Sequence, residues 1–460
     1  MTRRYRFINQ LLIAALVCGS IFIAPIFQLN SAFAASVGSS PCTSTVSDNT
    51  TVSVVYASGT AKCYLIFLRG SNSWTVPAGI TSADLLLIGG GGAGGGGAWA
   101  GGGGAGGVVL ANGYSLTPSS NYSIAIGDSG TPGVASLTSG PGPTGNLSGN
   151  GGDTWFNSNS SLVAKGGGAG ASYSWGQSSY AAYCAGRDGG SGGGATECNN
   201  GSVNAGGGTT QTLPAGATSF YGNAGGSTPS ANNASGAGGG GSGAAGTAVS
   251  GGNSPGAGGN GTQAFASWIS AISSAMPSAW QSATTGGYIA AGGGGAAQTF
   301  ALGGSGGGGK GGNNSSNTAI NGDDGVPNTG SGGGGGTYNG NSGYGGYGAY
   351  GLMIIRYAAS VSTTVSISLA GNVSTVTYRA PISITATLTG GNGKVRFFQD
   401  GKIIPGCQSI NSSGLSATCT WRPSSKRPIR ITAELVSGGA VLGSKSLPIT
   451  VSVVNRAGKR

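Results

Sequence analysis

Residues 84–107 read DLLLIGGGGAGGGGAWAGGGGAGG, an apolar strand-like run that passes directly into glycine. Glycine accounts for 100 of the 460 residues, most of them between Gly89 and Gly351, whereas an average protein contains roughly 7%. Because glycine has no side chain, this tract can neither pack a side-chain core nor supply a nucleophile, a base or a metal ligand. The tract is therefore predicted to be a scaffold held by its backbone, with function at its edges and loops.

Short apolar blocks frame and interrupt the glycine tract. A flexible Gly/Ser linker would not need them, and collagen is excluded because the tract lacks a strict Gly-X-Y period and the chain has only 17 prolines. Runs rich in β-branched and aromatic residues predict strands. These are residues 51–56, 62–68, 73–80, 84–88, 107–111, 122–126, 162–164, 300–302 and 352–357.

One segment departs from this pattern. Apolar residues recur at helical spacing from Phe265 through Trp268, Ile269 and Ile272 to Met276, and Pro277 ends the run. This spacing predicts a short amphipathic helix. We expect its apolar face to pack on the rest of the domain; contact with a partner or a membrane is the alternative.

Ordering the glycines requires repeated compensation, since fixing one backbone residue costs roughly 1–2 kcal/mol. Extended glycine helices with three residues per turn can lie side by side, because no side chain separates them. Their backbone groups can then bond to neighbouring helices for roughly 0.5–1.5 kcal/mol net per bond. The balance is close to zero, so such a bundle needs support from the flanking strands and from a disulfide.

The N-terminus has the features of a secretory signal. Arg3, Arg4 and Arg6 precede an apolar run, and Ala32-Phe33-Ala34 is a small-x-small cleavage site. The mature chain is therefore expected to begin at Ala35 and to be secreted; an uncleaved membrane anchor is the alternative. The predicted organisation is a signal at 1–34, a glycine-rich domain at 35–358, a β-sandwich at 359–453 and a basic tail at 454–460.

Removal of the signal leaves an even number of cysteines, which in a secreted chain indicates disulfides. Sequential pairing is the simplest arrangement, and a metal site is the competing interpretation, although the chain has no CxxC motif. The three pairs would be Cys42–Cys63, Cys184–Cys198 and Cys407–Cys419.

The residue types that catalysis needs are scarce. The chain has no histidine and only ten acidic residues, which removes the commonest general base and the commonest metal ligand. The adjacent pair Asp323-Asp324 is expected to be a turn, with weak calcium binding as the alternative. The G-x4-G-K run at 304–310 has Gly311 where a nucleotide-binding loop needs Ser or Thr. We therefore expect no enzyme activity, cofactor or metal.

The C-terminal part is strongly basic. From Ala359 to Arg460, twelve lysines and arginines stand against Asp400 and Glu434, a balance of 12 − 2 = +10. Such a module suggests acidic partners, namely wall polymers, anionic glycans or a membrane surface, and simple solubility is the alternative. Nucleic acid is not expected. The predicted basic patch comprises Lys426, Arg427, Arg430, Arg456, Lys459 and Arg460.

The same part alternates like a small all-β domain. Asp400-Gly401 is a tight hairpin signal, and the spacing of the short strands predicts a second β-sandwich of about ninety residues. The predicted strands are residues 361–369, 382–388, 394–399, 416–421, 429–435 and 447–453.

Three stretches resemble known bacterial families. The run from Trp74 to Ile80, followed by Leu85 to Ile88, resembles the opening of the glycine-rich domain of bacterial secreted proteins, and Gly345 to Tyr357 resembles its closing strand. The layout is similar to the glycine-rich region of the anaplastic lymphoma kinase ectodomain and to phage tail-fibre adhesins. The stretch Gly393 to Gly401 resembles bacterial Ig-like repeats of surface proteins. Neither family implies a catalytic site.

The resemblance implies an all-β fold: a jelly-roll-like β-sandwich carrying a polyglycine II helix bundle, followed by an Ig-like β-sandwich. The leading hypothesis is a secreted or surface-attached protein for adhesion or envelope structure that contacts cell-envelope polymers, glycans or surface proteins. Alternatives are a matrix component without a specific ligand, a secreted hydrolase and an ice-binding protein. The candidate contact residues are aromatic, although they could equally cap the bundle edge: Trp99, Tyr173, Trp175, Tyr180 and Tyr183.

Overall fold

The computed structural model describes most of the chain. The described residues are 35–39, 41–133, 147–172, 181–197, 203–229, 234–314, 321–337, 343–359, 364–389, 393–437, 440–442 and 445–455. The expected signal at 1–34 lies outside them, as do Arg456, Lys459 and Arg460. Within the described stretches, no helix is long and apolar enough to cross a membrane.

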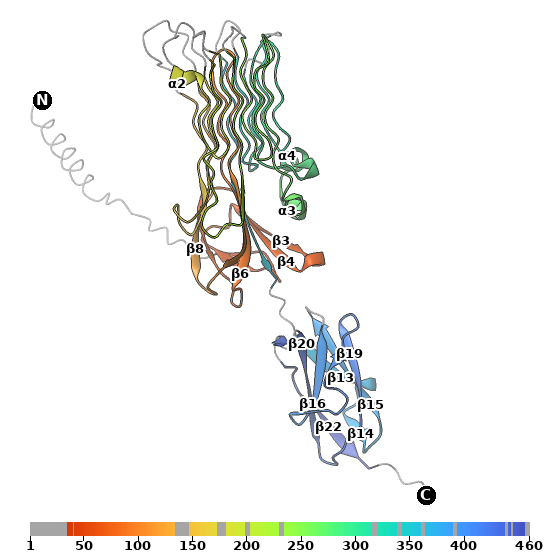
Figure 1. Cartoon of the computed structure of the whole chain (residues 1–460). Helices are drawn as coiled ribbons and strands as arrows, with labels where there is room; N and C mark the ends of the chain where they lie inside the picture. Colours follow the sequence, from red (N-terminus) through yellow and green to blue (C-terminus); the bar gives the residue numbers. More distant parts are fainter. Residues whose placement is uncertain are drawn as a thin grey trace, which may run out of the picture.

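The glycine-rich domain begins as a sandwich of two six-stranded sheets (Figure 1). The first sheet has the order β1 (Ala35–Val37), β2 (Ser44–Val46), β5 (Ser71–Thr75), β8 (Asn121–Ala125), β9 (Thr154–Phe156) and β10 (Leu162–Ala164). The second has the order β11 (Ser219–Tyr221), β7 (Val108–Ser115), β6 (Ser82–Ile88), β12 (Leu352–Ala358), β4 (Lys62–Phe67) and β3 (Val52–Ala57). The prediction of an all-β fold is confirmed.

Strand β6 shows why the second sheet lies at the centre of the domain. Leu85 and Leu87 point into the core between the sheets, whereas Leu86 and Ile88 point to the opposite face. This two-residue alternation is the ordinary pleat of a strand. Because both faces of β6 are buried, its residues are apolar without interruption from Leu85 to Ile88.

The outer face of that sheet is covered by helices α3 (Ala266–Ile272) and α4 (Ser278–Ala283), with 3-10 turns η2 (Ser273–Ala275) and η3 (Thr285–Gly287). All five apolar residues of the predicted helix are buried there, so it packs on its own domain. The helical run ends before Pro277, as predicted, but α4 was missed. Arg356 of β12 lies 4.1 Å from the Trp268 ring centroid and donates to Asp84 at 2.9 Å, which ties α3 to the sheet.

Beyond the sandwich the glycine segments run side by side as a long bundle (Figure 1). Their hydrogen bonds repeat every three residues, since consecutive N–H groups donate to different neighbouring segments and every third one returns to the same segment. Gly91, Gly94 and Gly97 donate to Ala349, Gly346 and Gly343. Gly92 and Gly95 donate to Gly104 and Gly101. This is the pattern that an extended helix with three residues per turn requires.

Segment 100–107 is enclosed by six others. It donates hydrogen bonds to segments 165–171, 237–240 and 330–336, and it accepts them from segments 89–95, 191–194 and 293–296. A Cβ atom built on Gly103 would lie 2.1 Å from the carbonyl oxygen of Gly92. No side chain fits at Gly103 unless the neighbouring backbone moves, whereas the methyl groups of Ala100 and Ala105 are accommodated, fully buried, in the same segment.

Asparagine and aspartate side chains accept N–H groups at the edges of the bundle. In two places they stand three residues apart and so follow the same period. Asn150 and Asp153 accept from Ala169 and Gly166, and Asn321 and Asp324 accept from Tyr344 and Tyr347. The prediction of a turn at Asp323-Asp324 was wrong, because the pair lies in a segment at the edge of the bundle. There the Asp324 carboxylate accepts the Tyr347 N–H, which among the described residues has no neighbouring backbone segment on that side to bond to.

Residues 300–302 were also wrongly predicted. Phe300 forms only an isolated bridge with Ala296, and Phe300 and Leu302 are exposed. The segment lies at the bundle edge, where the Lys310 ammonium sits 4.4 Å from the Phe300 ring centroid.

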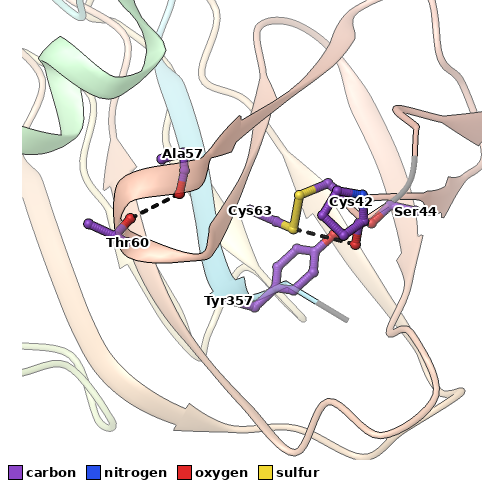
Figure 2. Close-up of a disulfide and its surroundings, with 7 residues drawn as sticks. Cys42, Ser44, Ala57, Thr60, Cys63 and Tyr357 are labelled. Carbon is purple, nitrogen blue, oxygen red and sulfur yellow. Dashed lines mark hydrogen bonds between the residues drawn. A yellow bond between two sulfur atoms is a disulfide. The ribbon is translucent and has the colours of Figure 1, made fainter. Parts of the chain in front are cut away.

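A disulfide closes the start of the domain against its sheet. Cys42 is bonded to Cys63 of β4, between β3 and β12 in the second sheet. Figure 2 shows the Tyr357 ring beside this disulfide, with its hydroxyl hydrogen-bonded to Ser44 at 2.7 Å. The first strands, the disulfide and the last strand of the domain therefore meet at one place. The turn η1 (Ser58–Thr60) joins β3 to β4 nearby.

Tyr357 makes the stability of this domain depend on pH. Burial raises the pKa of its hydroxyl above the ordinary value of 10.0, opposed by the hydrogen bond with Ser44. In the unfolded chain the phenol ionises first, so its contribution is complete below about pH 10 and is lost as pH rises toward the folded pKa. We expect Tyr357→Phe to cost about 1 kcal/mol at neutral pH and to lose less stability than the natural chain above pH 10.

The measurement is the free energy of unfolding in urea as a function of pH. Tyr347→Phe is the control, because Tyr347 is exposed. Identical alkaline losses for Tyr357→Phe and the natural chain would contradict the prediction.

The described residues between Thr364 and Asn455 form a second domain of two sheets, which we call the Ig-like module. One has the order β13 (Thr364–Leu369), β15 (Ile382–Thr389) and β19 (Ser416–Trp421). The other has the order β14 (Thr375–Thr377), β22 (Ile449–Val454), β20 (Ile429–Ser437), β16 (Lys394–Gln399) and β17 (Lys402–Ile403), with β18 (Ile410–Asn411) on β16 and β21 (Ala440–Leu442) on β20. The turn η4 (Ala370–Asn372) follows β13.

Most strands of this module match their predicted ranges. Asp400 and Gly401 have φ of +46° and +81°, as a tight two-residue hairpin requires. The disulfide Cys407–Cys419 is present in the core beside Phe397. The last strand was predicted two residues too early: Leu447 is 87% exposed and β22 begins at Ile449, because Pro448 cannot donate to a sheet ladder.

Candidate functional site

The end of the bundle away from the sandwich is the first candidate site. Helix α2 (Ala181–Cys184) lies there (Figure 1). Trp99 belongs to the same tip, because its segment links two antiparallel glycine segments, 89–97 and 100–107. We call this end, defined by Trp99, Tyr183, Cys184 and Glu197, the bundle tip.

Trp99 is held in an unusual conformation. Its φ is +54°, a region that costs a bulky L-residue roughly 1–3 kcal/mol and that glycine occupies freely. The half-buried indole packs with Ala98 against Cys184, and the Trp99 carbonyl accepts the Thr196 hydroxyl at 2.6 Å. Tryptophan at such a position in a chain so rich in glycine indicates that the side chain itself is needed, at least to close the bundle end.

The structure brings together two parts of the predicted aromatic set. Trp99 contacts Cys184, and Tyr183 precedes Cys184 in α2, where it is half-buried. Tyr173, Trp175 and Tyr180 lie outside the described residues. Cys184 is disulfide-bonded, whereas its predicted partner Cys198 lies outside the described residues.

Glu197 was not predicted as a site residue. It is only 5% exposed, and its Oε2 accepts the N–H of Ala234 at 2.5 Å. Its Oε1 is buried without a hydrogen-bond donor in the part of the chain that the structure describes. A buried carboxylate oxygen of this kind can accept a hydrogen bond from an O–H or N–H group. The one signal in the sequence was an acidic residue directly before Cys198, in a chain with few acids.

The second candidate surface lies on the Ig-like module. Lys426, Arg427 and Arg430 of the predicted patch are exposed, while the tail residues of that patch are not described. The backbone N–H of Arg430 donates to the Asp400 carboxylate at 2.9 Å. Three further exposed cations, which the predicted patch did not include, lie on or against the loop at residues 422–428 that carries Lys426 and Arg427: Arg379, Lys402 and Arg422.

The described residues contain no group of three or more His, Cys, Asp or Glu side chains that could hold a metal ion. The polar groups within the bundle are mostly backbone N–H and C=O already bonded to one another.

Comparison with known proteins assigns the glycine-rich part. The family model of the glycine-rich domain matches residues 67–358, more than half of the chain. No curated protein matches.

Two solved structures of the CARDB domain of the PF1109 protein from Pyrococcus furiosus, one of them a crystal structure in complex with di-metal ions, are 19% and 20% identical. Each covers 20% of this chain, and 87% and 95% of its own, with a TM-score of 0.16.

Proposed function

Because the chain belongs to the glycine-rich domain family, we propose that it is a secreted, non-catalytic adhesion protein of bacterial type. Its bundle, of the polyglycine II type, would be a rigid stalk that holds a contact surface at its tip. The observation that carries the proposal is the bundle tip itself. There a strained Trp99 packs on the disulfide-bonded Cys184 at the end farthest from the sandwich.

The proposal is supported by the different make-up of the bundle interior and of its edges and ends. The interior of the bundle is backbone bonded to backbone, so substitutions there affect folding and cannot create specificity. Side chains that can vary are confined to edges and ends. Aromatic side chains at such an end suit contact with sugars or proteins, since they offer large rigid surfaces at low entropic cost.

The proposed location follows from the disulfides. Cys42–Cys63 and Cys407–Cys419 both form in the described residues, and disulfides persist in oxidising compartments such as the cell exterior. The signal pattern before Ala35 supports export.

The test is binding of the full mature chain to bacterial cells and to a glycan array. We expect Trp99→Ala combined with Tyr183→Ala to weaken binding about tenfold or more, because aromatic anchors dominate such interfaces. The circular dichroism spectrum should stay unchanged.

The matched control is Tyr56→Ala combined with Phe220→Ala, which removes two exposed aromatic rings from β3 and β11 of the sandwich. If both double variants bound cells and glycans with equal affinity, the proposal of a contact surface at the bundle tip would be wrong. Silence of the natural chain on all glycans and cells would instead favour a matrix component without a specific ligand.

A further inference from the structure

The loop at residues 422–428 of the Ig-like module gathers cations that no described carboxylate neutralises. Exposed basic side chains stand on or against this loop: Arg379, Lys402, Arg422, Lys426 and Arg427. None of the five forms an ion pair with another described residue. Of the two acids in the module, Glu434 already binds Arg396 and Lys445, at 3.6 and 3.9 Å.

Backbone and ring contacts fix the cluster. The N–H of Arg379 donates to Pro423 O at 3.1 Å, and Arg422 Nη1 donates to Arg379 O at 3.2 Å. Arg379 and Lys426 both lie over the Tyr378 ring, 5.2 and 5.6 Å from its centroid. Five like charges thus lie on or against one loop without an ion pair to a described carboxylate, and only Arg379 and Lys426 are attracted by the Tyr378 ring.

Arg379 adds an independent observation. Its φ is +60°, where glycine or asparagine would be less strained. Keeping arginine at this turn costs stability, so the guanidinium is expected to serve a purpose other than folding.

A pocket of about 800 Å³ opens between this loop and the β16–β17 hairpin. Lys402 and Arg427 contribute its cations, and Ile403, Pro405 and Pro428 its apolar walls, with Ser424 among the polar groups. Asp400 also lines the pocket, and its Oδ1 accepts the backbone N–H of Arg430. We call this surface the basic pocket.

We propose that the basic pocket binds an anionic polysaccharide. The charges match carboxylate or sulfate groups, for which arginine offers bidentate hydrogen bonds. The apolar walls can pack on the C–H faces of sugar rings, and the further cations on or against the loop, Arg379, Arg422 and Lys426, can contact other acidic groups of the same polymer. A flat lipid surface would leave this concave, partly apolar site unfilled. The surface belongs to a different module from the bundle tip, so its binding is separable from the proposed adhesion.

The test is calorimetric titration of the full chain with a heparin octasaccharide, and with a dextran oligosaccharide of equal length as the uncharged probe. We expect binding to heparin only, weakened by salt. Arg427→Ala and Lys402→Ala should each weaken it about twofold to fivefold, and the pair about tenfold.

Lys394→Ala is the matched control. It removes one positive charge from the opposite end of strand β16, away from the pocket, and should leave binding unchanged. Equal loss in this variant and in Arg427→Ala would overturn the site, since binding would then follow net charge alone. Binding to phosphatidylglycerol vesicles or duplex DNA but not to heparin would overturn the assignment to a polysaccharide.

Discussion

Replacing Gly103 with alanine is expected to prevent the glycine-rich domain from reaching its native packing. The added methyl group would lie 2.1 Å from the carbonyl oxygen of Gly92 and 2.7 Å from its carbonyl carbon. Real Cβ atoms do not come so close to backbone, and segment 100–107 cannot shift because six neighbours enclose it. Any shift of this segment away from Gly92 would break its hydrogen bonds to neighbours on the other sides.

We expect a loss of more than about 4 kcal/mol, the range reached only by severe single substitutions. For a domain of about 300 residues that corresponds to a fall in Tm of roughly 6 °C or more, or to failure to fold. Differential scanning calorimetry measures it. The Ig-like transition should stay in place.

Gly251→Ala is the matched control, because no atom lies within 4 Å of the position of its Cβ. Its effect should stay within about 0.5 kcal/mol. A Gly103→Ala variant as stable as Gly251→Ala would show that the close packing of the bundle is not what stabilises the domain.

Most strands of the two sandwiches could be predicted from the sequence, because the alternation of apolar residues along a strand is a local property. Residues 394–399 and 416–421 were predicted with the bounds that β16 and β19 have. Six three-residue strands were missed, because so short a run carries no period: β1, β2, β9, β11, β14 and β21. Phe300 to Leu302 failed for the same reason: three apolar residues cannot tell a strand from a bundle edge.

The order of the glycine segments could not be read from the sequence. All glycine backbones are chemically alike, so nothing local states that Gly103 donates to Gly333 while Gly102 donates to Ala237. A partial signal existed in the edge residues. The three-residue spacing of Asn150 and Asp153 repeats the period of the bundle, and it can serve to find edge segments in related chains.

The two candidate sites could be predicted from the sequence only in part. Composition indicated the basic character of the C-terminal part, but not that Arg379 and Lys402 border the loop of Lys426 and Arg427. That arrangement depends on a hairpin and a turn folding against one loop. The contact of Trp99 with Cys184 depends likewise on the unpredictable order of the glycine segments.

Trp268→Ala is expected to cause the second large loss, of about 3–5 kcal/mol in the free energy of unfolding of the glycine-rich domain. Its indole is 4% exposed and meets the Tyr64 ring edge-on at a centroid distance of 5.9 Å. Arg356 lies over its face. Removal would leave a cavity under α3 and uncover the second sheet. Urea unfolding monitored by circular dichroism measures the loss, with Ser267→Ala, an exposed change on the same helix, as the near-neutral control.

A double-mutant cycle separates the two parts of this loss. If the guanidinium attracts the indole face, Trp268→Ala and Arg356→Ala together should cost about 0.5–2 kcal/mol less than the sum of the single losses. Additive losses would mean that Trp268 acts by filling space alone. The distinction bears on the whole domain, because the glycine bundle stabilises itself only marginally. The apolar face that α3 closes is then one of the few places where side-chain burial can hold the ordered glycines in their native arrangement.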